Sequence, residues 1–267
     1  MKIIIANTIA IFRRELQGYF ASPLAYIVAG IFWLLSGFFY VYILFSPEVG
    51  LIQVASAKDQ TGFPPGALDV AYEFLRAFLS VVGSLILFLL PMLSMGLYAE
   101  ERKQGTLELL ATSPLTNWTI AVGKLLGAVT FFVTMIIPLF IYETITLSAA
   151  DPPVQPGVTI IGHLGLILLA AATLSLGMFI SSLTDSSIIA AIITFALIFL
   201  LWIIDLIGQS IQGPMGDILE HLSLLKHYNN LVQGVFDTGS IVLLVSYIFL
   251  GIFLTAQSIE AFRFQRS

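Results

Sequence analysis

The chain contains few residue types that break or form bonds, and their spacing does not fit the common catalytic motifs. A phosphate-binding loop would read G-x-x-x-x-G-K-[ST]. Gly123-Lys124 is followed by Leu125, and Trp118 stands where the first glycine should be. We therefore expect no nucleotide hydrolysis by this chain and assign it no catalytic residue.

The three histidines do not form a metal-binding pattern. His163, His221 and His227 have neither an H-E-x-x-H arrangement nor a histidine partner four residues away. The usual zinc spacings are therefore missing, and no G-x-S-x-G nucleophile elbow is present either. The sequence predicts no metal and no cofactor bound by this chain itself.

The composition places the chain in the membrane class. Of its 267 residues, 58% are hydrophobic and only 10% are charged, whereas soluble domains carry roughly 25% charged residues. The net charge of −5 argues against a nucleic-acid partner. Without cysteine there are no disulfides, and the redox compartment stays open.

Six apolar segments are long enough to cross a bilayer, since about 20 helical residues span the hydrocarbon core. They cover residues 24–45, 77–99, 118–147, 158–184, 186–207 and 241–259. We expect an all-α polytopic integral membrane protein with six transmembrane helices, formed as one domain over residues 1–267. Pro91 and Pro138 are tolerated inside such spans, and we expect a kink at each.

A few ionisable residues fall within or beside these spans, where charge is costly and often functional. Glu143 and Asp205 lie one or two turns from the outer ends. They are either polar contacts on a transport path or, as we expect, residues that reach the outer headgroups. Lys124 is expected to extend to the inner membrane surface. Asp185 is expected to cap the fifth span.

The first twenty residues are predicted to form an amphipathic helix. Apolar side chains such as Ile9, Phe12 and Leu16 are spaced for one face, and Arg13 and Arg14 lie among them. The helix either lies in the membrane interface or simply leads into the first span. We expect no cleavable signal, because the first long apolar run is too long for one.

Basic residues predict the orientation, because lysine and arginine are enriched on the cytoplasmic side. With the N-terminus inside, eight basic residues lie on inner segments and three on outer ones: Lys2, Arg13, Arg14, Arg102, Lys103, Lys124, Arg263 and Arg266 against Lys58, Arg76 and Lys226. We therefore expect a multi-pass protein of the plasma membrane with both termini in the cytoplasm.

The stretch from 91 to 124 joins the second and third spans through an abruptly charged segment. Charges begin at Glu100, and Gly105-Thr106 opens a short segment that Pro114 closes. Thr106 is the expected N-cap, and Glu108 in the first turn complements the helix dipole. The apolar face consists of Leu107, Leu110 and Ala111. This pattern indicates a short helix at the membrane surface.

This stretch resembles the signature of ABC-2 type permeases, the membrane subunits of one class of ATP-binding-cassette exporters. The resemblance implies that loop 100–116 is a coupling helix that docks on an ATPase subunit. The loop residues are Glu100, Glu101, Arg102, Gly105, Thr106, Leu107, Glu108, Leu110 and Pro114. It also implies that ATP and Mg bind to the separate ATPase, and that a second permease copy forms a homodimer or heterodimer within the lipid.

Two further stretches resemble the gliding-motility branch of these permeases, and the copper-enzyme-maturation permeases are a neighbouring branch. The stretches are residues 13–26 and 227–237, and we also predict an amphipathic segment over residues 222–236. In the family, a short helical element before the last span dips back into the membrane. An alternative function is therefore an ATP-driven machine that transmits force to an extracytoplasmic partner without moving a solute. The sequence does not name a substrate.

Overall fold

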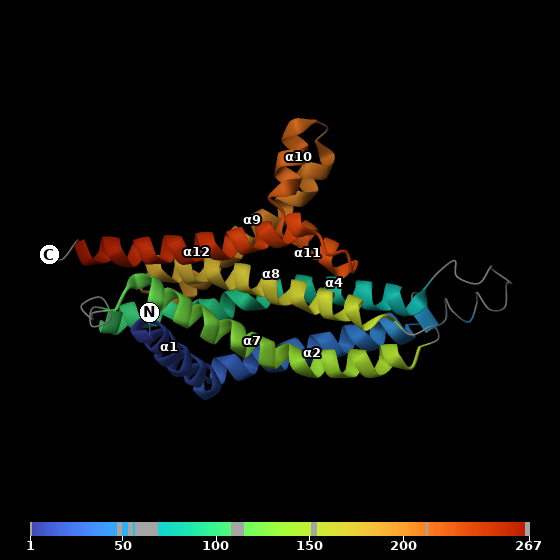
Figure 1. Cartoon of the computed structure of the whole chain (residues 1–267), viewed down its shortest axis with the longest axis horizontal. Coiled ribbons are helices and arrows are strands. Elements are labelled where there is room, and N and C mark those ends of the chain that lie inside the picture. The colour runs from blue at the N-terminus through green and yellow to red at the C-terminus, as the bar shows by residue number, and fades with distance from the viewer. Residues whose placement is uncertain are drawn as a thin grey trace.

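The computed structural model is predominantly helical, with no strand, in the residues it describes, which are 2–46, 50–52, 56, 69–107, 115–150, 154–211 and 213–264. Most of the helices run side by side along the long axis of the molecule (Figure 1). Six are long and apolar enough to cross a membrane. The predicted all-α fold with six spans is therefore confirmed.

The helices follow the predicted segments closely, with boundaries that differ by a few residues. In chain order they are α1 (Lys2–Ala21), α2 (Pro23–Phe45), α4 (Val70–Ser94), α5 (Gly96–Lys103), α7 (Asn117–Ser148), α8 (Pro156–Leu183), α9 (Ser187–Ser210), α10 (Pro214–His221), α11 (Leu224–Val232) and α12 (Thr238–Phe264). The second span is longer than predicted and combines α4 with α5.

Several helices begin at a polar side chain that accepts a hydrogen bond from a backbone amide of the first turn, as an N-cap does. Thr116 accepts from the amide of Thr119 and opens α7. At α9 the cap is Ser186, whose Oγ accepts from the amide of Ile189. The capping role predicted for Asp185 is therefore wrong.

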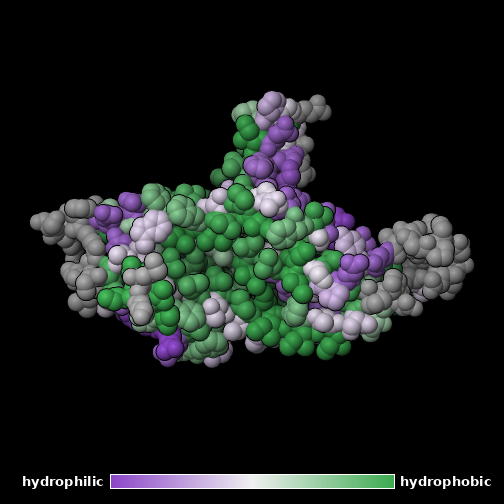
Figure 2. Space-filling model, viewed as in Figure 1, coloured by the Kyte–Doolittle hydropathy of each residue, from purple (hydrophilic) through white to green (hydrophobic). Residues whose placement is uncertain are grey.

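Helix α8 is the centre of the bundle. It contacts α4, α5, α7, α9, α11 and α12, and 78% of its most apolar stretch is buried inside the protein, compared with 22% for α2 and 17% for α9. The outer helices present apolar side chains outward, and hydrophobic residues cover the middle of the visible face (Figure 2). This distribution suits a bundle whose surroundings are lipid.

Helix α4 stops soon after Pro91. This proline lies inside α4, which ends at Ser94, and α5 begins at Gly96. A proline ring removes one backbone donor and crowds the preceding turn. The break lies at Met95, four residues after Pro91 and on the side away from the turn that the ring crowds, so the kink at Pro91 itself stays a prediction. By contrast, α7 continues past Pro138 to Ser148.

The segment before the last span forms two short helices. Helix α10 packs on the end of α9 and stands away from the main bundle (Figure 1). Helix α11 is amphipathic, as predicted, and its buried face includes Leu225, Tyr228 and Leu231. The Tyr228 hydroxyl donates to the carbonyl of Leu79 at 2.6 Å, which fixes α11 against α4.

The start of α1, the end of α12, the end of α5 and the start of α7 lie toward the same end of the bundle (Figure 1). The basic-residue bias predicts that this end is cytoplasmic.

Because the chain has no cysteine, single cysteines introduced at Gln60, Pro152, Met215 and Ser267 test this orientation without background. A membrane-impermeant maleimide should label the first three in intact cells, and Ser267→Cys only after permeabilisation. Labelling of position 152 only from the cytoplasm would contradict the prediction.

Candidate functional site

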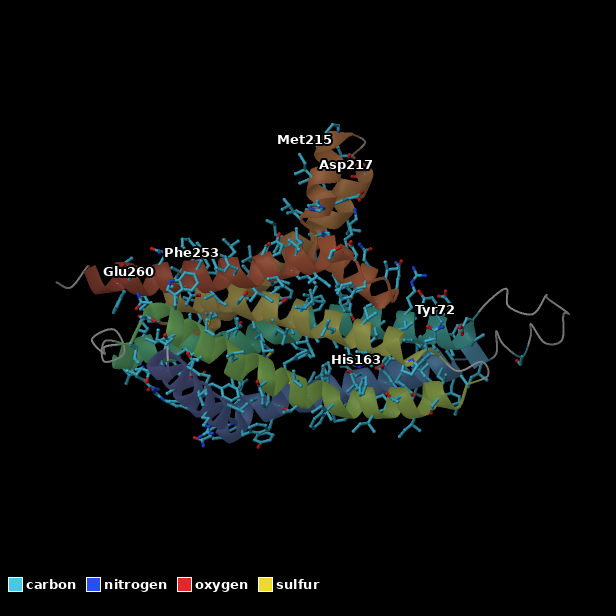
Figure 3. All side chains as sticks on the ribbon, in the orientation of Figure 1. Tyr72, His163, Met215, Asp217, Phe253 and Glu260 are labelled. Atoms are coloured by element: carbon cyan, nitrogen blue, oxygen red, sulfur yellow. The ribbon has the colours of Figure 1, made fainter. Side chains whose placement is uncertain are left out.

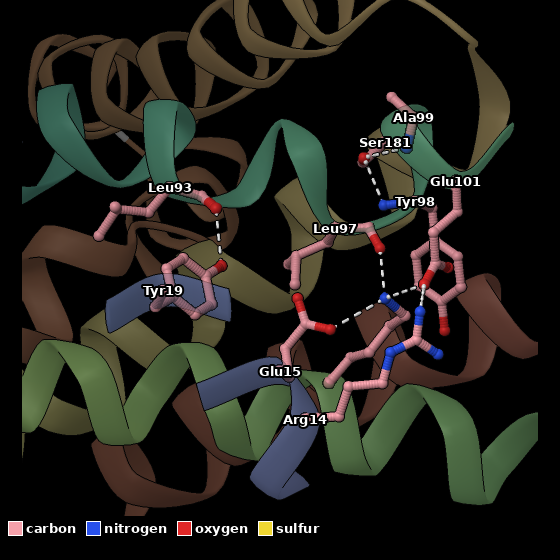
Figure 4. Close-up of polar contacts among 10 residues, drawn as sticks. Arg14, Glu15, Tyr19, Leu93, Leu97, Tyr98, Ala99, Glu101 and Ser181 are labelled. Carbon is pink, nitrogen blue, oxygen red and sulfur yellow. Dashed lines mark hydrogen bonds and ion pairs between the residues drawn. The ribbon is translucent and has the colours of Figure 1, made fainter. Parts of the chain in front are cut away.

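The first turn of α5 is held by a serine from the central helix. The Oγ of Ser181 accepts hydrogen bonds from the backbone amides of Tyr98 and Ala99, each at 3.0 Å, and donates to the carbonyl of Met95 at 2.7 Å (Figure 4). The first amides of a helix have no partner within it. Ser181 therefore satisfies the groups left open by the break between α4 and α5, and fixes α5 on α8.

A buried lysine joins α5 to α7 and α1. The Nζ of Lys124 contacts Glu15 at 3.0 Å, Glu101 at 3.1 Å and the carbonyl of Leu97 at 2.7 Å. It also lies 5.0 Å from the ring centre of Tyr98. An ammonium group has three N–H donors. Here each donor can be matched with an acceptor, because one acceptor comes from α1 and two come from α5.

Arg14 completes this group, which we term the inner charge cluster (Arg14, Glu15, Glu101 and Lys124). Its guanidinium Nη2 lies 3.8 Å from Glu101 and is largely exposed, whereas the Lys124 side chain is 4% exposed. The expectation that Lys124 extends to the inner membrane surface is wrong. A buried ammonium needs paired charge, and two carboxylates supply it inside the protein.

Two glycines let α1 approach α7 closely at this cluster. A methyl group added at Gly123 would lie 2.8 Å from the side chain of Ile11, and one at Gly127 would lie 2.8 Å from Cβ of Glu15. A Gly-x-x-x-Gly spacing places both on one helix face, an arrangement that allows close helix contact in membranes. The close approach brings Glu15 within reach of Lys124.

Tyr19 fixes the second half of α1. Its hydroxyl donates to the carbonyl of Leu93 at 2.7 Å, and its ring stacks on Phe131. Burial, together with nearby Glu15 and Glu100, raises the pKa of the Tyr19 hydroxyl well above its usual range. The hydroxyl therefore keeps its proton and remains a donor. A cavity of about 170 Å³ lies beside it, lined in part by Glu15 and Glu100.

Arg102 connects α5 to the last helix and to α8. Its Nη1 donates to the carbonyl of Ser182 at 3.0 Å, and its guanidinium carbon lies 5.1 Å from the ring centre of Phe262. A cation over an aromatic face is stabilised by the ring electrons. With Ser181 and Lys124, Arg102 gives α5 contacts to α1, α7, α8 and α12.

The turn after α5 matches the prediction at one residue and differs at two. Gly105 has a φ of +72°, which glycine adopts without steric cost. Thr106 is already helical, so it is not the N-cap, and its hydroxyl donates to the carbonyl of Glu101 at 3.2 Å. Leu107 is 2% exposed and packs in the core rather than facing a partner or the bilayer.

The remaining predicted loop residues fall into two groups. Glu108, Leu110 and Pro114 lie outside the described residues. Glu100, by contrast, is exposed, and so are Lys103 and Gln104 at the end of α5. The described part of the predicted coupling loop therefore has one side held by the bundle and one polar side facing outward.

The two predicted polar positions in the spans lie elsewhere in the bundle. Asp205 lies in α9, but its side chain is outside the described part of the structure. Glu143 is completely buried, and its carboxylate faces His163 with 3.6 Å between Oε2 and Nε2. The expectation that Glu143 reaches the outer headgroups is wrong. No cluster of three metal-ligating side chains occurs among the described residues.

The fold and this site define a polytopic helical membrane protein with a charged, tightly held loop at one end. A model of the ABC-2 family transporter proteins matches residues 9–267. The chain therefore belongs to the ABC-2 family of transporter proteins, as a membrane component. A comparison with curated proteins found no match.

Sequence reasoning missed the residues that hold the loop in place. Ser181 stood in a short polar run between two apolar spans, and Glu15 was one of several polar points on α1. Their partners are distant in sequence: 109 residues separate Glu15 from Lys124. The sequence did contain one signal: Lys124 lies within an apolar run of a span, and a lysine there needs an acidic partner if it does not reach water.

The cluster predicts a large effect for a change at Lys124. In Lys124→Met, a side chain of similar length leaves the mostly buried Glu15 carboxylate without its cation, and leaves Glu101 with only the exposed Arg14 at 3.8 Å. We expect a loss of about 3 kcal/mol in stability, as when one partner of a buried ion pair is removed, measured by thermal unfolding of the purified chain. Lys103→Met changes an exposed lysine on α5 and should leave the unfolding temperature nearly unaltered. Equal effects of the two substitutions would contradict the assigned role of Lys124.

Proposed function

We propose that the chain is the permease subunit of an ABC exporter driven by a separate ATPase subunit that docks on loop 100–116. ABC-2 membrane proteins generally partner with such an ATPase. The observation that supports the docking surface is the two-sided environment of α5. Its buried side is joined to α1, α7, α8 and α12 by side-chain contacts, and its outward side presents Glu100 and Lys103.

In this proposal, the ATPase binds ATP and Mg, and two permease copies, identical or different, assemble with two ATPase copies. The loop end and both termini lie in the cytoplasm, and the protein resides in the plasma membrane. The resemblance to the gliding-motility and copper-enzyme-maturation branches remains a prediction about biological role.

The coupling step follows from how α5 is held. Closure of the ATPase dimer on ATP displaces the loop. The displacement reaches α1 and α7 through Lys124, and α8 through Ser181 and Arg102. Because α4 and α5 are separate helices at Met95, α5 can tilt while α4 keeps its packing. A change in these helices alters the exposure of a path at the permease interface.

The proposal is tested by co-expression with the cognate ATPase. The purified permease alone should not hydrolyse ATP, and the complex should contain two copies of each subunit. Glu108→Lys and Leu110→Asp each place an unfavourable charge at the docking surface, where a desolvated, unpaired charge typically costs several kcal/mol. Both should leave the amount of permease in the membrane unchanged and abolish ATPase co-purification or the coupling of hydrolysis to transport.

The matched control for Leu110→Asp is Met215→Asp. It also replaces an apolar residue by an aspartate, but at an exposed position of α10 that stands away from the loop (Figure 3). This variant should retain the ATPase. Wild-type binding and activity in both loop variants would show that loop 100–116 is not the coupling element. ATP hydrolysis by the isolated permease, free of other ATPases, would contradict the division of labour between the subunits.

A further inference from the structure

An acidic side chain is enclosed in the outer half of the bundle without a conventional partner. Glu143 of α7 has a relative exposure of 0%. Neither of its carboxyl oxygens hydrogen bonds to any group in the described part of the chain. The position lies within a membrane-spanning helix, where an ionisable residue is costly and often functional. Glu143 is not part of the inner charge cluster or of the loop assigned to coupling.

The nearest ionisable group is a histidine of the next helix. His163 of α8 places Nε2 3.6 Å from Oε2 of Glu143, and its side chain is 7% exposed. His163 is therefore buried among the helices of the bundle. The rings of His163 and Phe140 pack in a T-shaped arrangement, with 4.9 Å between the ring centres. The pair is thus enclosed by apolar groups.

The other ring nitrogen fixes where the histidine carries its proton. Nδ1 lies 3.0 Å from the carbonyl oxygen of Thr159. A carbonyl only accepts hydrogen bonds, so Nδ1 carries the hydrogen. In the neutral ring Nε2 is then a bare acceptor, and it faces Glu143. Nε2 likewise has no hydrogen-bond partner among the described residues.

The other ionisable side chains of the described residues that interact electrostatically with Glu143 are tyrosines from three helices: Tyr40 of α2, Tyr142 of α7 and Tyr228 of α11. Phenols ionise only near pH 10, so they bring no charge at neutral pH. The Tyr40 hydroxyl hydrogen bonds with the hydroxyl of Thr146, and the Tyr228 hydroxyl donates to the carbonyl of Leu79. Among the described residues, His163 alone lies at ion-pair distance from Glu143.

We propose that Glu143 and His163 form a binding site for a single proton within the membrane region, with the proton on the Glu143 carboxyl. An ionised carboxylate here would be a buried charge without donors, and transfer of the proton to His163 would bury two ions instead of none. The neutral acid has one O–H donor, and Nε2 is the acceptor that faces it.

The site holds its proton only while α7 and α8 remain packed around it. Separation of the two helices, or entry of water, would lower the cost of a charged carboxylate and release the proton. This inference concerns the permease chain alone and does not depend on the ATPase, so it stands or falls separately from the proposed function.

Infrared spectroscopy of the permease in lipid nanodiscs tests the protonation state directly. At neutral pH the wild type should show a carboxylic-acid C=O band that is absent in Glu143→Gln and shifted in Glu143→Asp. Glu73→Gln removes an exposed acid of α4 and should leave the band in place. Absence of a Glu143-dependent carboxylic-acid band in the wild type would overturn the proposal.

Thermal unfolding against pH gives a second readout. Because the folded site holds a proton, its contribution to stability is present at low pH and is lost as the pH rises far enough to remove that proton. The wild type should lose unfolding temperature with rising pH more steeply than Glu143→Gln, whose neutral amide can still donate to Nε2. Identical pH profiles for the two proteins would also overturn the proposal. The wild-type band and its shift in Glu143→Asp decide the question if the glutamine variant does not fold.

Discussion

The inner end of the structure depends on one buried cation. Lys124 lies on a span whose neighbours in sequence are apolar, and the protein surrounds its ammonium group with two carboxylates and a backbone carbonyl. Removal of either carboxylate would take away part of the negative charge that compensates the ammonium at low dielectric. The constraint fixes more than a pair of residues, because the acceptors come from α1 and from α5. Three segments that are distant in sequence must therefore meet at one point.

This constraint explains why the surrounding features take the form they do. Gly123 and Gly127 lie beside Lys124 because α1 must come close enough for Glu15 to reach it. The carbonyl of Leu97, in the first turn of α5, accepts from the ammonium, and Ser181 accepts from the amides of Tyr98 and Ala99 in the same turn. Figure 4 shows these contacts close together around α5, with partners on α1 and α8. A force applied at the outward side of α5 would thus be transmitted to the helices that these contacts join to it.

The features that the sequence predicted well are those that depend on local pattern. Apolar runs of sufficient length defined the six spans, and the amphipathic face of 222–236 anticipated α11. Gly105 was expected at a sharp turn and has the left-handed backbone that such a turn needs. These properties follow from periodicity and from the chemistry of single residues, so one sequence is enough to infer them.

The errors concern side chains whose surroundings are set by distant segments. Lys124 and Glu143 were both assigned to the membrane surface, because a charge in an apolar run reaches water when it has no partner. Each has a partner on another helix, and the pairing is invisible until the helices are packed. Leu107 was likewise placed on an outward face, because the distant segments that cover it cannot be inferred from its local pattern. The loop that contains Glu108 and Leu110 lies outside the described residues, so its predicted helix remains a prediction.

The central claim is that Lys124 holds α1 and α5 together as one unit at the inner end. Spin labels on exposed positions of the two helices, Arg13→Cys and Lys103→Cys, test this by pulsed electron spin resonance in the cysteine-free chain. The account predicts a narrow distance distribution that stays narrow when the ATPase partner and ATP are added, and that broadens when Lys124→Met is introduced. A distribution that is equally narrow with and without Lys124 would contradict it.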